Sequence, residues 1–293
     1  KEKTTTLSIP PPEKNTVRVI PLGGVEEVGK NMTAIEFGND IVIVDCGFQF
    51  HGEETPGIDY ILPNTKYLEE RKEKIRAMAI THGHLDHIGG IPYLIGRLGN
   101  PPIYTRNLTM LMIKKRQEEF REMPPLNLKV IEKTARIKAG EFYLRFFAVS
   151  HTIPDAMGII IETPYGNIVH TGDLKLDHKD GVPDAHEVEE FKQFQKENVL
   201  LLLADSTNVE RPGFSIPEKT VFATLDDIIK NARGRLIIGT FASQIERISR
   251  IIEIAEKHKK KVVIDGYSMK TNVEIAQISG VLSPKNDTII PIH

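Results

Sequence analysis

Short runs of apolar and β-branched residues, separated by turn residues, mark the first two thirds of the chain. This pattern predicts strands at residues 17–22, 33–37, 41–45, 75–81, 142–149, 157–163 and 167–170. Helical spacing is predicted at residues 64–74, from residue 88 onward and over residues 106–122. The second and third of these strands are joined by Gly38-Asn39-Asp40, which favours a β-hairpin. The alternation of strands and helices predicts an α/β fold.

The pattern changes near residue 209. The run 199–205 is uninterrupted and apolar and ends in a carboxylate, which predicts a parallel strand covered on both faces. Beyond it, residues 236–240, 244–257 and 262–265 predict a β-α-β unit. The polar start of the chain predicts a flexible tail. We therefore expect a flexible tail at 1–16, a first domain at 17–208 and a second domain at 209–293.

Composition limits the classes of protein that the chain can belong to. Its 293 residues carry a net charge of −2, so a polyanionic partner would have to meet a local surface rather than an overall positive field. One cysteine, Cys46, excludes an intramolecular disulfide and favours a reducing, cytoplasmic location. No apolar stretch approaches the roughly 20 residues that span a bilayer, so we expect no membrane partner.

The segment T-H-G-H-L-D-H at residues 81–87 holds the strongest chemical signal. It places His82, His84, Asp86 and His87 between a predicted buried strand and a predicted helix. Imidazole nitrogens and carboxylate oxygens are the usual ligands of Zn²⁺. His82 and His84 alternate along an extended stretch and can point to one side, while the side chains of Asp86 and His87 diverge. This spacing favours two metal ions over one; the alternative is a surface loop with incidental histidines.

Polar side chains also follow three other predicted strands. Asp45 follows an apolar run, His151 follows residues 142–149, and Asp173 follows residues 167–170. Taken singly, each could cap a turn or serve a structural loop. Their occurrence alongside the 81–87 segment indicates that they contribute to the same site, because α/β scaffolds build rigid sites from strand ends.

Several motifs together resemble the metallo-β-lactamase superfamily and, within it, the ribonuclease J family. They are G-G-V-E-E-V-G-K-N-M, D-C-G-F-Q-F, T-H-G-H-L-D-H-I-G-G-I-P-Y, S-H-T-I-P-D, H-T-G-D-L-K and A-D-S-T-N, and they run in order along the chain. The resemblance implies an αββα sandwich with a dinuclear zinc site, followed by a partial α/β β-CASP domain. It implies that His82, His84 and His151 hold one Zn²⁺, that Asp86 and His87 hold the other, and that Asp173 bridges the two. Asp45 would orient a ligand or the bound water.

The same resemblance implies a ribonuclease that hydrolyses single-stranded RNA by a metal-activated hydroxide, in endonucleolytic mode, 5′–3′ exonucleolytic mode or both. Asp205 matches the first acidic motif of the β-CASP region and is a candidate catalytic residue. The candidate RNA-binding residues are Ser206, Asn208, Phe241, Ser243 and Arg247. Mn²⁺ is possible in place of Zn²⁺, because His and Asp suit both. A homo-oligomer is also possible.

The later motifs of the family do not occur before residue 293, so we expect a fragment or a truncated form. The second zinc site would then be short of one ligand. The final His293 superficially resembles the missing ligand motif, and we interpret that match as coincidence. Two alternatives stay open: another hydrolase on this scaffold, acting on a lactam or a thioester, and a catalytically weak RNA-binding subunit.

Overall fold

The computed structural model describes residues 9–10, 12–52, 56–120, 122–285 and 287–291. Among these, the strands form two large sheets, one of six strands and one of five, with two small two-stranded ribbons. Part of the predicted tail at 1–16 lies outside the described residues. His293 lies outside them too.

The first sheet is built from the predicted N-terminal strands. Its strands in spatial order are β1 (Val17–Gly23), β2 (Met32–Phe37), β3 (Asp40–Val44), β6 (Ile75–Ala79), β7 (Ile103–Thr105) and β8 (Leu128–Val130). β2 and β3 form the predicted antiparallel hairpin, and β6 lies parallel to β3. Because β3 and β6 are parallel neighbours, the residues that follow them meet at the same edge of the sheet.

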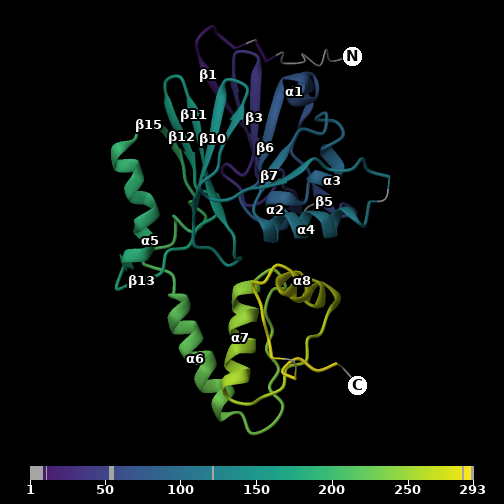
Figure 1. The fold of residues 1–293 in the computed structure, drawn as a ribbon, viewed down its shortest axis with the longest axis vertical. Helices are drawn as coiled ribbons and strands as arrows, with labels where there is room; N and C mark the ends of the chain where they lie inside the picture. The colour runs from purple at the N-terminus through teal and green to yellow at the C-terminus, as the bar shows by residue number, and fades with distance from the viewer. Residues whose placement is uncertain (1–8, 11, 53–55, 121, 286, 292–293) are drawn as a thin grey trace.

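The second sheet contains the later strands. In spatial order they are β15 (Val199–Leu203), β12 (Gly166–His170), β11 (Met157–Thr163), β10 (Phe142–Ala148) and β9 (Arg136–Ala139). The two ribbons pair β4 (Gln49–Phe50) with β5 (Tyr60–Ile61), and β13 (His178–Lys179) with β14 (Val182–Pro183). The two large sheets lie face to face (Figure 1).

Helices cover the outer faces of both sheets. Against the first sheet lie α1 (Lys66–Glu69), η1 (Lys72–Lys74), α2 (Leu85–Ile88), α3 (Ile91–Leu94) and α4 (Asn107–Gln117), and beside the second lie α5 (Ala185–Glu189) and η2 (Glu190–Lys196). The predicted segments at 64–74 and 106–122 are thus helical over shorter spans.

The strand alternation explains this layering. In β3, Val42 and Val44 pack between the sheets against the second sheet, while Ile41 and Ile43 pack outward with the helices. Phe147 on β10 packs outward against the aromatic rings of η2. The expected αββα sandwich is therefore confirmed.

The C-terminal helices α6 (Glu218–Asn231), α7 (Ile245–Lys257) and α8 (Tyr267–Ile278) lie together at one end of the sandwich (Figure 1). Ile248 and Ile252 of α7 and Val273 of α8 share a buried cluster with Leu108 of α4. This cluster joins the C-terminal helices to the sandwich.

Two predictions for the second half are wrong. β15 runs parallel to β12 as predicted, but it is the edge strand and is not covered on both faces: Leu200 is 52% and Leu202 58% exposed. The predicted β-α-β unit has only its helix. Residues 236–240 form no strand, and Val262 makes a single parallel bridge to Ile289. The described residues provide no neighbouring strands with which these apolar segments could pair.

Candidate metal centre

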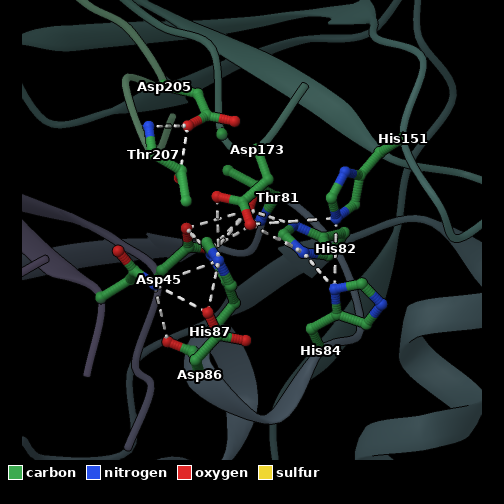
Figure 2. A network of polar contacts seen from close by, with 12 residues as sticks. Asp45, Thr81, His82, His84, Asp86, His87, His151, Asp173, Asp205 and Thr207 are labelled. Carbon is green, nitrogen blue, oxygen red and sulfur yellow. Dashed lines mark hydrogen bonds and ion pairs between the residues drawn. The ribbon is translucent and has the colours of Figure 1, made fainter. Parts of the chain in front are cut away.

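The site lies where four segments end. β3 leads into Asp45, β6 into Thr81 and His82, β10 toward His151, and β12 toward Asp173. α2 then begins at Leu85, directly after His84. Figure 2 shows the resulting convergence of imidazole rings and carboxylates.

Three backbone features permit this close approach. Asp45 has a φ of 61°, a left-handed conformation that Asp tolerates better than a β-branched residue would. At Gly47, a Cβ would lie 1.6 Å from the backbone oxygen of Asp86, so only glycine lets this segment pass α2. Gly172 has a φ of 61° and packs against the side chain of Thr81.

The metal-capable side chains fall into two groups that share Asp173. The first group is His82, His84, His151 and Asp173, and the second is Asp86, His87 and Asp173; the ligand atoms within each group lie within 4.8 Å of one another. The structure thus brings together all six side chains predicted as metal ligands.

The first group converges on one point. His84 Nδ1 lies 3.1 Å from His82 Nε2 and 3.2 Å from His151 Nε2. A tetrahedral Zn²⁺ with ligands at about 2.0–2.1 Å would separate neighbouring nitrogens by about 3.3 Å. Protons alone cannot satisfy three converging nitrogens equally, whereas a single cation can. These residues therefore fit a divalent cation.

The second group converges on the Nε2 atom of His87. His87 Nε2 lies 3.4 Å from Asp86 Oδ2 and 3.3 Å from Asp173 Oδ1. An imidazole nitrogen between two carboxylate oxygens also fits a divalent cation.

Hydrogen bonds beneath the ligands fix the orientation of the rings. His87 Nδ1 lies 2.8 Å from Asp45 Oδ2, and His82 Nδ1 lies 3.0 Å from Thr81 Oγ1. Thr81 also donates its backbone N–H to Asp45 Oδ1 over 2.8 Å. If both Nδ1 atoms carry the proton, both Nε2 lone pairs point into the site, which is the arrangement that metal-binding histidines need.

The histidine pKa values are shifted in opposite directions in the two groups. Burial, followed by the neighbouring imidazoles, lowers the pKa of His82 well below its usual value, and burial lowers the pKa of His151 to about 4. Burial alone would also lower the pKa of His87, but Asp45, Asp173 and Asp86 outweigh it and raise that pKa. Burial opposes ionisation of Asp173, yet the hydrogen bond from His87 brings its pKa down to about 2. His82 and His151 are therefore neutral imidazoles beside the ionised carboxylate of Asp173.

A cavity of about 890 Å³ opens beside the second group. Its lining includes Asp45, Asp86, His87, Asp173 and Asp205. Among the described residues, its lining contains acidic side chains and no Lys or Arg. A polyanion would therefore meet repulsion here unless cations were bound.

Asp205 lies outside both metal groups. Its Oδ2 accepts the backbone N–H of Leu174 over 3.1 Å, and its Oδ1 accepts the Thr207 backbone N–H over 2.9 Å. The carboxylate thus ties the end of β15 to the segment that follows Asp173.

The predicted RNA-binding residues are distributed more widely. Ser206 lines the cavity, whereas Asn208, Phe241, Ser243 and Arg247 are not part of its lining. Phe241 is 76% exposed. The Arg247 guanidinium is engaged by Glu218 and Gln244. The backbone of Ser243 comes close to His84: burial lowers the pKa of His84, and the Ser243 backbone acts in the opposite direction.

Sequence reasoning missed two residues of the site, Thr81 and Asn31. Thr81 is 1% exposed and contacts Asp45 and both His82 and His87. Asn31 Nδ2 lies 3.2 Å from Asp86 Oδ2. Asn31 stands within the quoted G-G-V-E-E-V-G-K-N-M motif, but a single Asn carries no spacing that predicts a partner 55 residues away.

Comparison with known proteins places this geometry in a family. The family model of the metallo-beta-lactamase superfamily matches residues 25–215. The chain belongs to this superfamily. A second model, for the beta-CASP domain of ribonuclease J, matches residues 233–293. The chain is therefore a ribonuclease J-like metallo-β-lactamase with a β-CASP segment, and the boundary near 209 stays a prediction.

Curated relatives agree with this placement. The chain is 40% identical to Ribonuclease J of Mycoplasma pneumoniae over 282 residues, which covers 96% of this chain and 49% of the relative. It is 42% identical to Ribonuclease J of Thermus thermophilus over 276 residues, which covers 92% of this chain and 48% of the relative. The chain thus spans about half the length of the curated relatives it matches.

A solved structure shares the fold. A protein of unknown function from Enterococcus faecalis V583 superposes with a TM-score of 0.68 at 18% identity, covering 93% of this chain and 73% of that one. Among the described residues, no helix combines the length and apolarity needed to cross a membrane.

Proposed function

We propose that this chain is a metal-dependent ribonuclease that hydrolyses phosphodiester bonds of single-stranded RNA with two divalent cations, Zn²⁺ or Mn²⁺. One observation carries the proposal: two ligand groups share Asp173 at the edge of an open cavity. The ribonuclease J relatives support RNA as the substrate. The single cysteine supports a cytoplasmic location.

His82, His84, His151 and Asp173 would hold one cation, and Asp86, His87 and Asp173 the other. When bound, such a pair lowers the pKa of water and neutralises charge on phosphoryl oxygens. The chain's own residues orient this chemistry. Asp45 and Thr81 hold the imidazoles of His87 and His82 with their Nε2 atoms facing the site. The joint carboxylate of Asp173 keeps the two groups adjacent.

Asp205 would act as a positioning residue. By accepting the Leu174 N–H, it holds the segment that carries Asp173. We propose that Ser206 and Asn208 meet the RNA backbone and that Phe241, Ser243 and Arg247 line its path. The position of Ser206 on the cavity and the exposure of Phe241 support this path. Base stacking on an exposed aromatic ring adds affinity without sequence preference.

The test is an assay of the full chain with a labelled single-stranded RNA in Zn²⁺ or Mn²⁺. We expect RNA cleavage that is abolished by chelation and by His82→Ala. A chromogenic lactam and a thioester serve as rival substrates. Turnover of either rival without RNA cleavage would refute the proposal, and RNA binding with no cleavage would favour the weak RNA-binding subunit.

A further inference from the structure

Asn31 is the last residue of the β1–β2 loop, and its backbone is held at the second ligand group. Its backbone N–H donates to Asp86 O over 2.9 Å, and its carbonyl accepts the Gly47 N–H over 2.9 Å. Asn31 therefore joins the segment after β3 to the start of α2. The side chain then begins from a fixed point beside Asp86 and His87.

The side-chain amide faces the ligands themselves. Asn31 Nδ2 lies 3.2 Å from Asp86 Oδ2, 3.2 Å from Asp86 O and 3.1 Å from His87 Nε2. An amide nitrogen carries two hydrogens, so it cannot serve three acceptors equally. Because His87 Nδ1 faces Asp45, the His87 Nε2 lone pair is the one available to a cation. The two N–H groups of the Asn31 amide are then left for the carboxylate oxygen Oδ2 and the backbone carbonyl oxygen of Asp86.

A glycine at position 24 makes room for this amide. Gly24 has a φ of 82°, and a Cβ there would lie 2.2 Å from Asn31 Oδ1. Oδ1 packs against Gly24, and Nδ2 faces the ligand group. Asn31 lines the same cavity as Asp86 and His87.

We propose that Asn31 is a positioning residue of the second metal group: its amide holds the Asp86 carboxylate in the orientation that binds the second cation. The consequence for catalysis rests on the proposed function, but the effect on metal binding does not. The first group has no such contact with Asn31 among the described residues. The second cation should therefore depend on Asn31 and the first should not.

The experiment titrates the metal-free full chain with Zn²⁺ in competition with a chromophoric chelator, which resolves two binding steps. Asp86→Asn identifies the step that belongs to the second group. In Asn31→Ala, that step should weaken about 10–100-fold, as is usual when a group that orients a metal ligand is lost. The other step should keep its wild-type affinity.

The matched control is Asn167→Ala. Asn167 Nδ2 donates to Glu197 Oε2 over 2.8 Å, so this variant also removes an amide–carboxylate hydrogen bond, but away from the metal groups. It should leave both binding steps unchanged. If Asn31→Ala does not fold, Asn31→Ser provides the test. The serine side chain is too short for its hydroxyl to reach the Asp86 carboxylate, so binding of the second cation should weaken in this variant as well.

An unchanged second step in the folded Asn31 variant, or equal weakening of both steps, would overturn the inference. RNA cleavage by the wild-type chain, measured in parallel, separates this failure from that of the proposed function. Two bound cations without RNA cleavage would refute the ribonuclease and leave the role of Asn31 intact. RNA cleavage with an unaltered second step in Asn31→Ala would refute the role of Asn31 alone.

Discussion

Asp45 Oδ2 lies 2.8 Å from His87 Nδ1, and both side chains are only 1% exposed. A buried carboxylate is stable only when its oxygens are paired, and Thr81 supplies the remaining partners. The pair therefore sets which nitrogen of His87 faces the cavity.

We predict that Asp45→Asn weakens binding of the second cation and lowers RNA cleavage, each by about 10–100-fold, because the amide that replaces the carboxylate lacks its negative charge and one of its two acceptor oxygens, so it orients the His87 ring less well. Metal titration and cleavage rates measure the two effects. Asp40→Asn is the control: Asp40 is another buried carboxylate, but it pairs with Arg76 and the Glu141 N–H. It should lower the melting temperature without changing metal affinity. Wild-type metal binding in Asp45→Asn would contradict the assigned role.

Thr81→Val should destabilise the metal-free protein by about 1–3 kcal/mol. Valine has nearly the shape of threonine but lacks the hydroxyl, so the buried Asp45 and His82 each lose a hydrogen-bond partner. Thr109→Val is the matched control. Thr109 is fully buried, and its hydroxyl has no hydrogen-bond partner among the described residues. The control should be neutral or stabilising, since it removes an unsatisfied polar group. Urea unfolding of both variants measures the difference, and equal destabilisation would argue against the role of Thr81.

Binding of single-stranded RNA should depend on metal. The cavity beside the second group is lined by several carboxylates and, within the described part of the chain, by no Lys or Arg side chain. The metal-free chain should therefore bind a non-cleavable RNA analogue at least about 10-fold more weakly than the loaded chain, since each cation reduces the repulsion of the phosphates. Fluorescence anisotropy at fixed ionic strength measures this. Equal affinity in both states would place the RNA elsewhere.

Stability should fall in acid partly through Glu162. The hydrogen bond from Arg136, opposed by burial and reinforced by Arg145, lowers the pKa of Glu162 below its usual value. A carboxyl with a lowered folded-state pKa stabilises the protein above its unfolded pKa, and this contribution is lost as pH falls through the folded value. The stability gap between wild type and Glu162→Gln should therefore be constant from pH 7 to pH 6 and narrow below about pH 4.5. Thermal melts of the metal-free proteins measure it, and a gap that widens in acid would contradict the assignment.

Much of the metal centre could be predicted from the sequence because its ligands follow buried strands. His82, His84, Asp86 and His87 are neighbours along the chain, so their proximity needs no tertiary information. Asp45, His151 and Asp173 required the inference that strand ends meet, and the structure brings them together. Asn31 and Thr81 escaped because their importance lies in contacts with distant residues, which local spacing does not encode.

The second half was harder to predict for a different reason. An apolar run such as Val199–Leu203 has the composition of a covered strand, but its burial depends on which elements pack beside it. In the described structure, β15 is an edge strand, and residues 236–240 find no strand partner. α7 was predicted correctly because its apolar face repeats at helical spacing and packs on α4 and α8.

Two cations should bind beside one another at Asp173, and anomalous diffraction from crystals grown with Zn²⁺ would locate both of them. We expect two peaks about 3.5–4 Å apart, one among His82, His84 and His151 and the other between Asp86 and His87. The absence of anomalous density at these side chains, or peaks confined to other parts of the molecule, would contradict it.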